Sequence, residues 1–287
     1  MHRQLVPEDI TDLAAARWGT ARDPRVADVM QALVRHLHDF AREVRLTEYE
    51  WAAGMRWLVR AGQISTDKRD EFILASDVLG LSMLVVELNH RFDQRATPAT
   101  VLGPFHIDGS PQLRYGSDMA DGVPGVPLYI TGTVRDLDGE PVAGALLDVW
   151  QADAEGAYEA QLEVAEARLR AKYTATAEGA YCVRTIAPIG YTIPMDGPVG
   201  ELISRTEISH YRPAHIHFRL DAPGYAPLVT HLFREGAPYL DSDVVFGAKA
   251  ELVVEFRPRE PGPTPDGGAC GVPWLLANHD FVLQPIS

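Results

Sequence analysis

The chain has 287 residues, of which 46% are hydrophobic and 23% are charged, a composition typical of a globular protein. Acidic residues outnumber basic ones by 40 to 26, and the resulting net charge of −14 argues against nucleic acid or a membrane surface as partner. Two cysteines, Cys182 and Cys270, are too few for a disulfide-rich secreted fold. With no signal-peptide pattern and no membrane-spanning run, we expect a reducing, cytoplasmic setting.

The first hundred residues have the periodicity of helices, and we expect them to form a helical N-terminal domain over residues 1–100. Asp23 followed by Pro24 is typical of a helix start. Apolar residues then recur at spacings of three and four, which predicts one apolar helix face: Val26, Val29, Met30, Leu33, Leu37, Phe40 and Val44. This stripe is expected to be core or an interface between two copies of the chain.

Two further helices are predicted in this part of the chain. Thr47 and Glu50 have the spacing of a capping box, and the helix that they begin is expected to run to Gly62. A third helix is predicted from Thr66–Asp67 to Val86, with Gly80 as a position where it can bend.

From residue 101 to 287 the pattern changes to short β-rich runs between glycine and proline clusters, which predicts a β-sandwich and an α+β fold overall. Strands are expected at 129–134, 145–151, 180–184, 215–220, 228–233 and 251–256. Asp138–Gly139 predicts a hairpin turn between the first two strands. Residues 162–172 are charged and helix-prone, and the residues after Arg257 are expected to form an irregular tail.

His215 and His217 are two residues apart in a predicted strand, so both side chains point to the same face and can bind one metal ion. A zinc hydrolase or an Fe(II) oxygenase would need one more histidine or a carboxylate. Candidates for that third ligand are Asp221, His231, Asp241 and Asp243. A binding module without a tight metal also stays open on these residues alone.

Four segments in chain order resemble the intradiol ring-cleaving dioxygenases. They are residues 101–105, residues 147–153 with Gly156 and Tyr158, residues 190–194 with 196–198, and residues 212–218. The resemblance implies Fe(3+) bound by Tyr158, Tyr191, His215 and His217. It also implies a β-sandwich catalytic domain over residues 101–287, and a homodimer through the N-terminal helices that can enclose a phospholipid.

The chemistry of ferric iron suits such a ligand set. Free tyrosine has a pKa of about 10, but a bound cation removes the phenolic proton. Two phenolates and one hydroxide balance the three positive charges, and neutral imidazoles complete the site. By the resemblance, Tyr191 is the labile ligand that acts as a base, while Arg212 stabilises negative charge developing on the substrate ring.

Residues 228–233 and 239–247 are similar to the members of this family that cleave hydroxyquinol with O2 to 3-hydroxy-cis,cis-muconate; catechol or a chlorocatechol is the alternative substrate. The implied pocket residues are Met83, Val86, Val101, Leu102, Gly103, Pro104, Phe105, Ile193, Pro194, Arg212 and Val245, with His231 behind the metal ligands. One position disagrees. An acid that meets the third hydroxyl is expected near Val86, whereas the nearby acid is Glu87, about 100° further round the helix.

Overall fold

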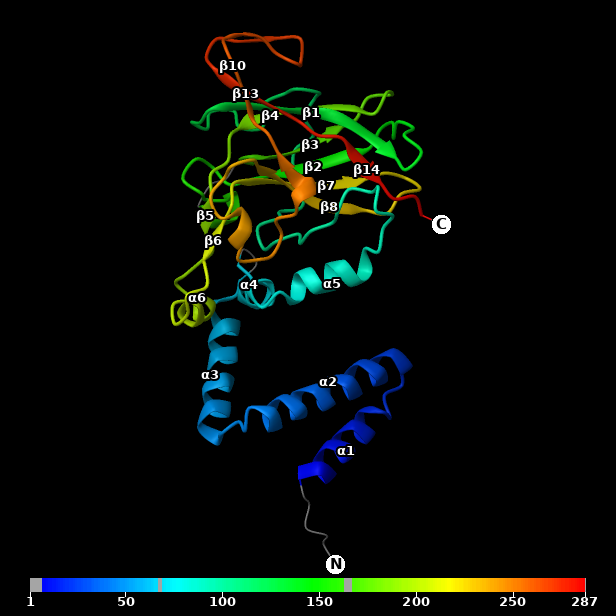
Figure 1. Cartoon of the computed structure of the whole chain (residues 1–287), viewed down its shortest axis with the longest axis vertical. Coiled ribbons are helices and arrows are strands. Elements are labelled where there is room, and N and C mark those ends of the chain that lie inside the picture. The colour runs from blue at the N-terminus through cyan, green and yellow to red at the C-terminus, as the bar shows by residue number, and fades with distance from the viewer. Residues whose placement is uncertain (1–6, 67–68, 163–166, 287) are drawn as a thin grey trace, which may run out of the picture. The chain divides into compact units, whose positions relative to one another are not determined.

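The structure is a computed structural model that describes residues 7–66, 69–162 and 167–286. The chain forms two compact units, Met1–Val59 and Arg60–Ser287. Figure 1 shows the labelled elements. The domain boundary expected at residue 100 stays a prediction.

The N-terminal helices begin where their capping residues predict. They are α1 (Pro7–Trp18), α2 (Pro24–Glu43) and α3 (Glu48–Ile64). The Asp23 carboxylate accepts a hydrogen bond from the Arg25 N–H at 2.8 Å. Thr47 and Glu50 form the predicted capping box, with the Thr47 N–H donating to Glu50 Oε2 at 2.9 Å. Within the first unit the side chains of the apolar stripe on α2, such as Leu37, are about half exposed.

The third predicted helix is two helices, α4 (Glu71–Val78) and α5 (Leu81–Asn89). Gly80 between them has φ of 73°, a left-handed conformation that ends one helix before the next begins. The predicted helix start at Thr66 was wrong, and Asp67 lies outside the described residues. Asp70 caps α4, because its carboxylate accepts hydrogen bonds from two backbone N–H groups of the first turn, each at 3.0 Å. Within the described ranges, no helix has the length and apolar character to cross a bilayer.

The second unit contains the predicted β-sandwich. One sheet has the order β10-β13-β1-β14, with β4 also paired to β1, and the other has the order β3-β2-β7-β8-β9 (Figure 1). The first sheet comprises β1 (Pro127–Asp136), β4 (Ala180–Ile186), β10 (Arg257–Arg259), β13 (Trp274–Asn278) and β14 (Phe281–Leu283). The second comprises β2 (Leu146–Trp150), β3 (Arg170–Thr174), β7 (His215–Asp221), β8 (Leu228–Arg234) and β9 (Val253–Val254). Ile130 of β1 and Phe218 of β7 are fully buried in the core that the two sheets share.

Short elements complete this unit. They are α6 (Pro198–Ile203), β5 (Tyr191–Thr192), β6 (Tyr211–Arg212), β11 (Gly262–Pro263), β12 (Ala269–Cys270) and the 3-10 turns η1 (Glu159–Gln161), η2 (Leu240–Ser242) and η3 (Ala250–Leu252). β5 pairs with β6, which places Tyr191 opposite Arg212. β2 pairs with β7, which places Trp150 opposite His217.

Three sequence-based expectations for this unit were wrong. The turn at Asp138–Gly139 forms, but β1 and β2 belong to different sheets, so it does not join a hairpin. In the helix-prone stretch 162–172, residues 170–172 begin β3, because Ala171 and Tyr173 alternate into the core; residues 163–166 lie outside the described part. The expected tail instead contributes β10, β13 and β14, because Phe281 and its neighbours bury apolar surface beside β1.

Candidate active site

Strand β7 places the two predicted histidine ligands on one buried face. His215 and His217 are each 2% exposed, and their Nε2 atoms lie 3.2 and 3.0 Å from the Oη of Tyr158. The His215 Nδ1–H donates to the carbonyl oxygen of Pro213 at 2.7 Å, which fixes the tautomer and leaves Nε2 with its lone pair. Arg212 Nη1 donates to the same Nε2 at 3.0 Å, and a guanidinium can only donate.

Two phenols from separate loops meet these imidazoles. Tyr158 precedes η1, and its backbone N–H is held by Gln161 Oε1 at 2.9 Å, while its ring stacks on Phe105 with centroids 4.6 Å apart. The Oη of Tyr191 donates to the Oη of Tyr158 at 3.3 Å. Gly156 is needed beside them, because a Cβ there would lie 2.7 Å from the Cβ of Tyr191. The structure therefore brings all four predicted ligands together.

The four side chains fit a single metal ion. Two ligand atoms that are each about 2.1 Å from one ion, at a right angle, lie about 3 Å apart. The Tyr158 oxygen lies 3.2 and 3.0 Å from the two imidazole nitrogens and 3.3 Å from the Tyr191 oxygen, which matches that spacing. Two oxygen and two nitrogen donors of this kind suit a hard transition-metal ion such as ferric iron.

Burial keeps all four ligands neutral when no cation is present. It raises the pKa of Tyr158 well above its ordinary value, and the neighbouring Tyr191 adds to this. Burial also raises the pKa of Tyr191, although the charge of Arg212 opposes the effect. Burial lowers the pKa of His215 to about 3, so that its imidazole is unprotonated and able to bind a metal at neutral pH. Metal binding must therefore expel the phenolic protons.

A third histidine, His231 of β8, lies beside the pair. Its Nδ1 is hydrogen-bonded to Thr100 Oγ1, and its ligand atom lies within 4.8 Å of those of His215 and His217. In the described part of the chain no carboxylate joins this group. Of the acids considered as third ligands, Asp243 binds Arg212 instead. His231 therefore lies next to the ligands, where the sequence analysis expected it.

These buried histidines predict that the metal-free protein is sensitive to acid. The unfolded chain protonates histidine near pH 6.5, whereas His215 takes a proton only near pH 3, and burial also lowers the pKa of His217 and His231. Between these two pH values the unfolded state binds more protons than the folded state. The free energy of unfolding therefore decreases as the pH is lowered. From pH 7 to pH 5 the free energy of unfolding should fall by about 2 kcal/mol per histidine.

Urea unfolding of metal-free protein at the two pH values checks this. Burial raises the pKa of Asp77 to about 6, so between pH 7 and pH 5 this carboxylate takes up a proton in the folded state and not in the unfolded state. This uptake should offset about 1 kcal/mol of the decrease in the free energy of unfolding. The variant His231→Gln should lose about one third of the dependence. Equal stability at both pH values would contradict the assignment of three buried neutral imidazoles.

Arg212 is held in the site by a buried ion pair. It is 4% exposed, and its Nε and Nη2 donate to the Asp243 carboxylate at 3.0 and 3.3 Å. Burial alone would raise the pKa of Asp243, but Arg212 lowers it, and the N–H groups of Val245 and Gly247 also donate to this carboxylate. The guanidinium is thus fixed beside His215 with its charge retained.

Comparisons with known proteins agree with this geometry. A family model described as Dioxygenase matches residues 101–285, and one described as Catechol dioxygenase N terminus matches residues 23–97. The chain belongs to the intradiol ring-cleavage dioxygenase family. The family uses non-haem iron.

Individual relatives cover this dioxygenase almost completely. It is 50% identical to the 6-chlorohydroxyquinol 1,2-dioxygenase of Cupriavidus pinatubonensis, over 96% of this chain and 97% of that one. It is 44% identical to the hydroxyquinol 1,2-dioxygenase of Nocardioides simplex, over 99% and 97%. The crystal structure of hydroxyquinol 1,2-dioxygenase from Pseudomonas putida DLL-E4 matches with a TM-score of 0.89 and 45% identity, over 98% and 99% of the two chains.

Several of the expected pocket residues lie near the four predicted ligands of this dioxygenase. A Cβ on Gly103 would lie 3.4 Å from His217 Cε1, so only a glycine leaves this space free. Pro104, Phe105 and Pro194 line one narrow cavity. Ile193 and Pro194 line another, of about 560 Å³, whose wall includes Tyr191. Three of the other expected residues, Met83, Val101 and Val245, are buried, whereas Leu102 is 39% exposed.

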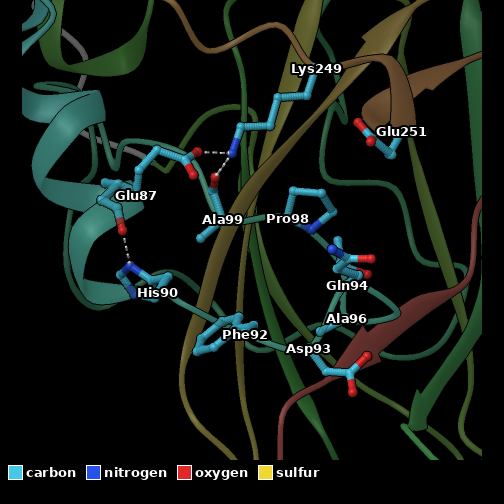
Figure 2. A pocket seen from close by; sticks show the side chains of 12 residues that line it. Glu87, His90, Phe92, Asp93, Gln94, Ala96, Pro98, Ala99, Lys249 and Glu251 are labelled. Atoms are coloured by element: carbon cyan, nitrogen blue, oxygen red, sulfur yellow. Dashed lines mark hydrogen bonds and ion pairs between the residues drawn. The ribbon is translucent and has the colours of Figure 1, made fainter.

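Val86 lies in a different place. It lines a cavity of about 600 Å³ with Glu87, His90 and Lys249, and this cavity contains none of the four ligands (Figure 2). Glu87 is paired there with Lys249, which also donates to the carbonyl oxygen of Ala99 at 2.8 Å. Glu87 is therefore engaged away from the four ligands, and the role of Val86 stays a prediction.

The acid that the sequence analysis missed is Asp77 of α4. It is 2% exposed, and its Oδ1 has no hydrogen-bond partner among the described residues. Burial raises the pKa of Asp77 to about 6, and the charges of Arg212 and Asp243 also act on it. A signal was present in the sequence, because a carboxylate in the middle of an apolar helical run is costly to bury without a purpose.

Proposed function

We propose that this dioxygenase cleaves the ring of hydroxyquinol, 1,2,4-trihydroxybenzene, between its adjacent hydroxyl-bearing carbons. The names of relatives at 50% and 44% identity support the substrate class. The observation that carries the proposal is the convergence of Tyr158, Tyr191, His215 and His217 beside the buried Arg212.

Tyr158, Tyr191, His215 and His217 would hold Fe(3+). Bound there, the ion supplies the Lewis acidity and redox chemistry that let an aromatic diol react with O2. The roles of the protein residues follow from their positions. Tyr158 contacts both imidazoles and is 2% exposed, so it stays in place. Of these side chains Tyr191 hydrogen-bonds only to the neighbouring phenol, and it lines an open cavity, so it has room to move and to take the proton of a substrate hydroxyl at its Oη.

Asp77 is proposed to accept a hydrogen bond from the third hydroxyl of hydroxyquinol. Changing Asp77 to Ala should lower kcat/KM for hydroxyquinol by about 100-fold and leave catechol turnover nearly unchanged, because only the triol offers a partner to this carboxylate. Steady-state kinetics on both substrates measure the change in preference. Glu87→Gln is the matched control, since this acid is bound by Lys249. An equal loss on both substrates would contradict the assignment.

Oxygen uptake and product analysis with hydroxyquinol, catechol and 4-chlorocatechol test the function. We expect one O2 consumed per hydroxyquinol, an acyclic hydroxymuconate or its tautomer maleylacetate as product, and a visible tyrosinate-to-iron absorption band. A higher kcat/KM for catechol would favour the alternative substrate. Colourless protein that consumes no O2 with any diol would refute the proposal.

The remaining expectations concern assembly and location. We propose a homodimer through the N-terminal helices, with a phospholipid enclosed, in the cytoplasm. The exposed apolar stripe of α2, which includes Leu37 and Phe40, supports such a contact between copies.

A further inference from the structure

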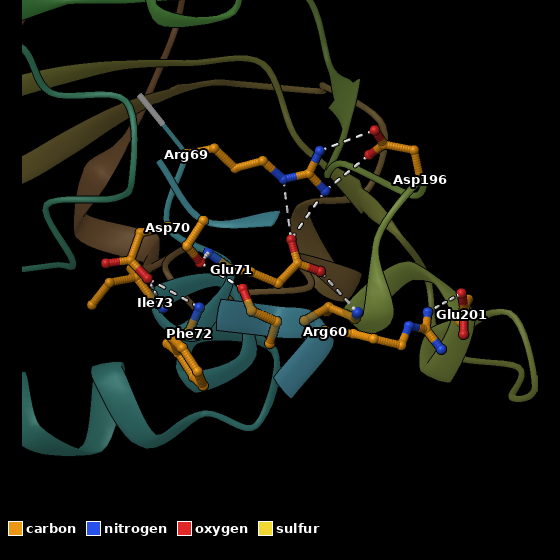
Figure 3. A network of polar contacts seen from close by, with 11 residues as sticks. Arg60, Arg69, Asp70, Glu71, Phe72, Ile73, Asp196 and Glu201 are labelled. Carbon is orange, nitrogen blue, oxygen red and sulfur yellow. Dashed lines mark hydrogen bonds and ion pairs between the residues drawn. The ribbon is translucent and has the colours of Figure 1, made fainter. Parts of the chain in front are cut away.

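An ion-pair network around the buried Glu71 joins the start of α4 to the segment that follows Tyr191. Glu71 is fully buried, and its carboxylate accepts hydrogen bonds from Arg69 Nε at 3.2 Å, from Arg69 Nη2 at 3.0 Å and from the backbone N–H of Val199 at 2.9 Å. Arg69 also pairs with both carboxylate oxygens of Asp196, each at 2.9 Å (Figure 3). We call Arg69, Glu71 and Asp196 the α4 clamp.

The segment from Ile193 to Val199 is fixed at both ends. At its start, the Ile193 N–H donates to the carbonyl oxygen of His210 at 3.0 Å and extends the pairing of β5 with β6. At its end, Val199 is bound by Glu71. The backbone between them lies directly on the clamp, since a Cβ on Gly197 would be only 2.4 Å from Glu71 Oε1. Movement of this segment therefore requires the clamp to open.

The clamp also lies where two walls of the pocket meet. Arg69, Phe105 and Pro194 line both a cavity of about 410 Å³ and a narrow cavity whose wall includes Leu74 of α4. The ring of Phe105 stacks on Tyr158, so this shared wall residue is in direct contact with one of the four predicted ligands. The distance between Pro194 and α4 is thus set by the clamp, and α4 is the helix that carries the proposed hydroxyl-binding acid.

We propose that the α4 clamp is a positioning device for substrate fit. It holds Pro194 at a fixed distance from Leu74 and Phe105, and so sets the width of the space that receives the aromatic ring, without contacting the metal ligands. Charge-assisted hydrogen bonds of a fully buried carboxylate suit this role, because they are strong and directional. The inference rests on the proposed function, since it concerns recognition of that substrate.

Two amide substitutions and one matched control test this. Glu71→Gln should raise KM for hydroxyquinol about tenfold with kcat changed less than about twofold, because loss of one charged hydrogen bond widens the site without altering the reacting groups. Asp196→Asn should raise KM about threefold. Glu201→Gln should change neither KM nor kcat. Glu201, on the adjacent α6, pairs with Arg60 of α3 and does not contact the clamp (Figure 3). Iron content and the visible band should stay as in the wild type.

Each result bears on a single statement. If the wild type does not cleave hydroxyquinol, the proposed function fails. If it does, and both clamp variants keep the wild-type KM, the clamp proposal fails. A shifted visible band or lost iron would also overturn it, since the clamp would then act on the metal ligands. The Asp196 side chain is 72% exposed, so Asp196→Asn decides the matter even if Glu71→Gln does not fold.

Discussion

Changing Tyr191 to Phe is expected to lower kcat about 1,000-fold while part of the iron is retained. The variant keeps the ring and its packing but has no phenolate to accept the proton of the incoming diol. The other three ligands, Tyr158, His215 and His217, remain in contact with one another, so they can still hold a metal ion. Steady-state kinetics, iron per chain and the visible spectrum of the same preparation measure the three quantities.

Tyr225→Phe is the matched control, because its hydroxyl binds Asp136 and not the site. Tyr158→Phe gives a contrast. Since the Tyr158 oxygen contacts the Nε2 atoms of both imidazoles, its loss should remove the iron as well as the activity. Undiminished turnover in Tyr191→Phe would contradict the role of base, and equal iron loss in both tyrosine variants would contradict the division of roles between them.

Changing Arg212 to Ala should lower kcat about 100-fold, because the site loses the fixed positive charge beside the reacting ring. It should also lower the free energy of unfolding by about 3 to 5 kcal/mol, because the Asp243 carboxylate stays buried without its partner. Urea unfolding and kinetics separate the two effects. The double variant Arg212→Met with Asp243→Asn should recover most of the stability but little of the turnover. Recovery of both would mean that the arginine is structural.

Much of the candidate site could be predicted from the sequence, because its side chains lie in short motifs whose residues are close together in the chain. The alternation of a strand places His215 and His217 on one face, and the motifs around Tyr158 and Tyr191 carried the family resemblance. Asp77 was missed because its place in an apolar helical run shows that it is buried but not which charges surround it. Its partner charges come from segments more than a hundred residues away, and only the tertiary structure brings them together.

The fold was predicted less well wherever a strand depends on a distant partner. β3 contains charged residues and has little propensity to mark it, yet pairing with β2 and burial of Ala171 and Tyr173 decide its state. Residues beyond Arg257 contain many prolines and glycines, so the composition indicated a loop. The apolar side chains of Trp274 and Phe281 overrode that composition, because they complete the sheet beside β1.

The pairing of β1 with β13 and β14 constrains when this protein can fold. Residues 128–131 lie beside residues 275–278, and residues 134–136 lie beside residues 281–283. The first strand of the sandwich therefore cannot complete its pairing until β13 and β14 have been synthesised. Until then this sheet cannot close, and the edge of β1 that residues 275–283 cover stays unpaired. Chains that end prematurely, even a few residues before Phe281, should be degraded rather than accumulate as partly active enzyme.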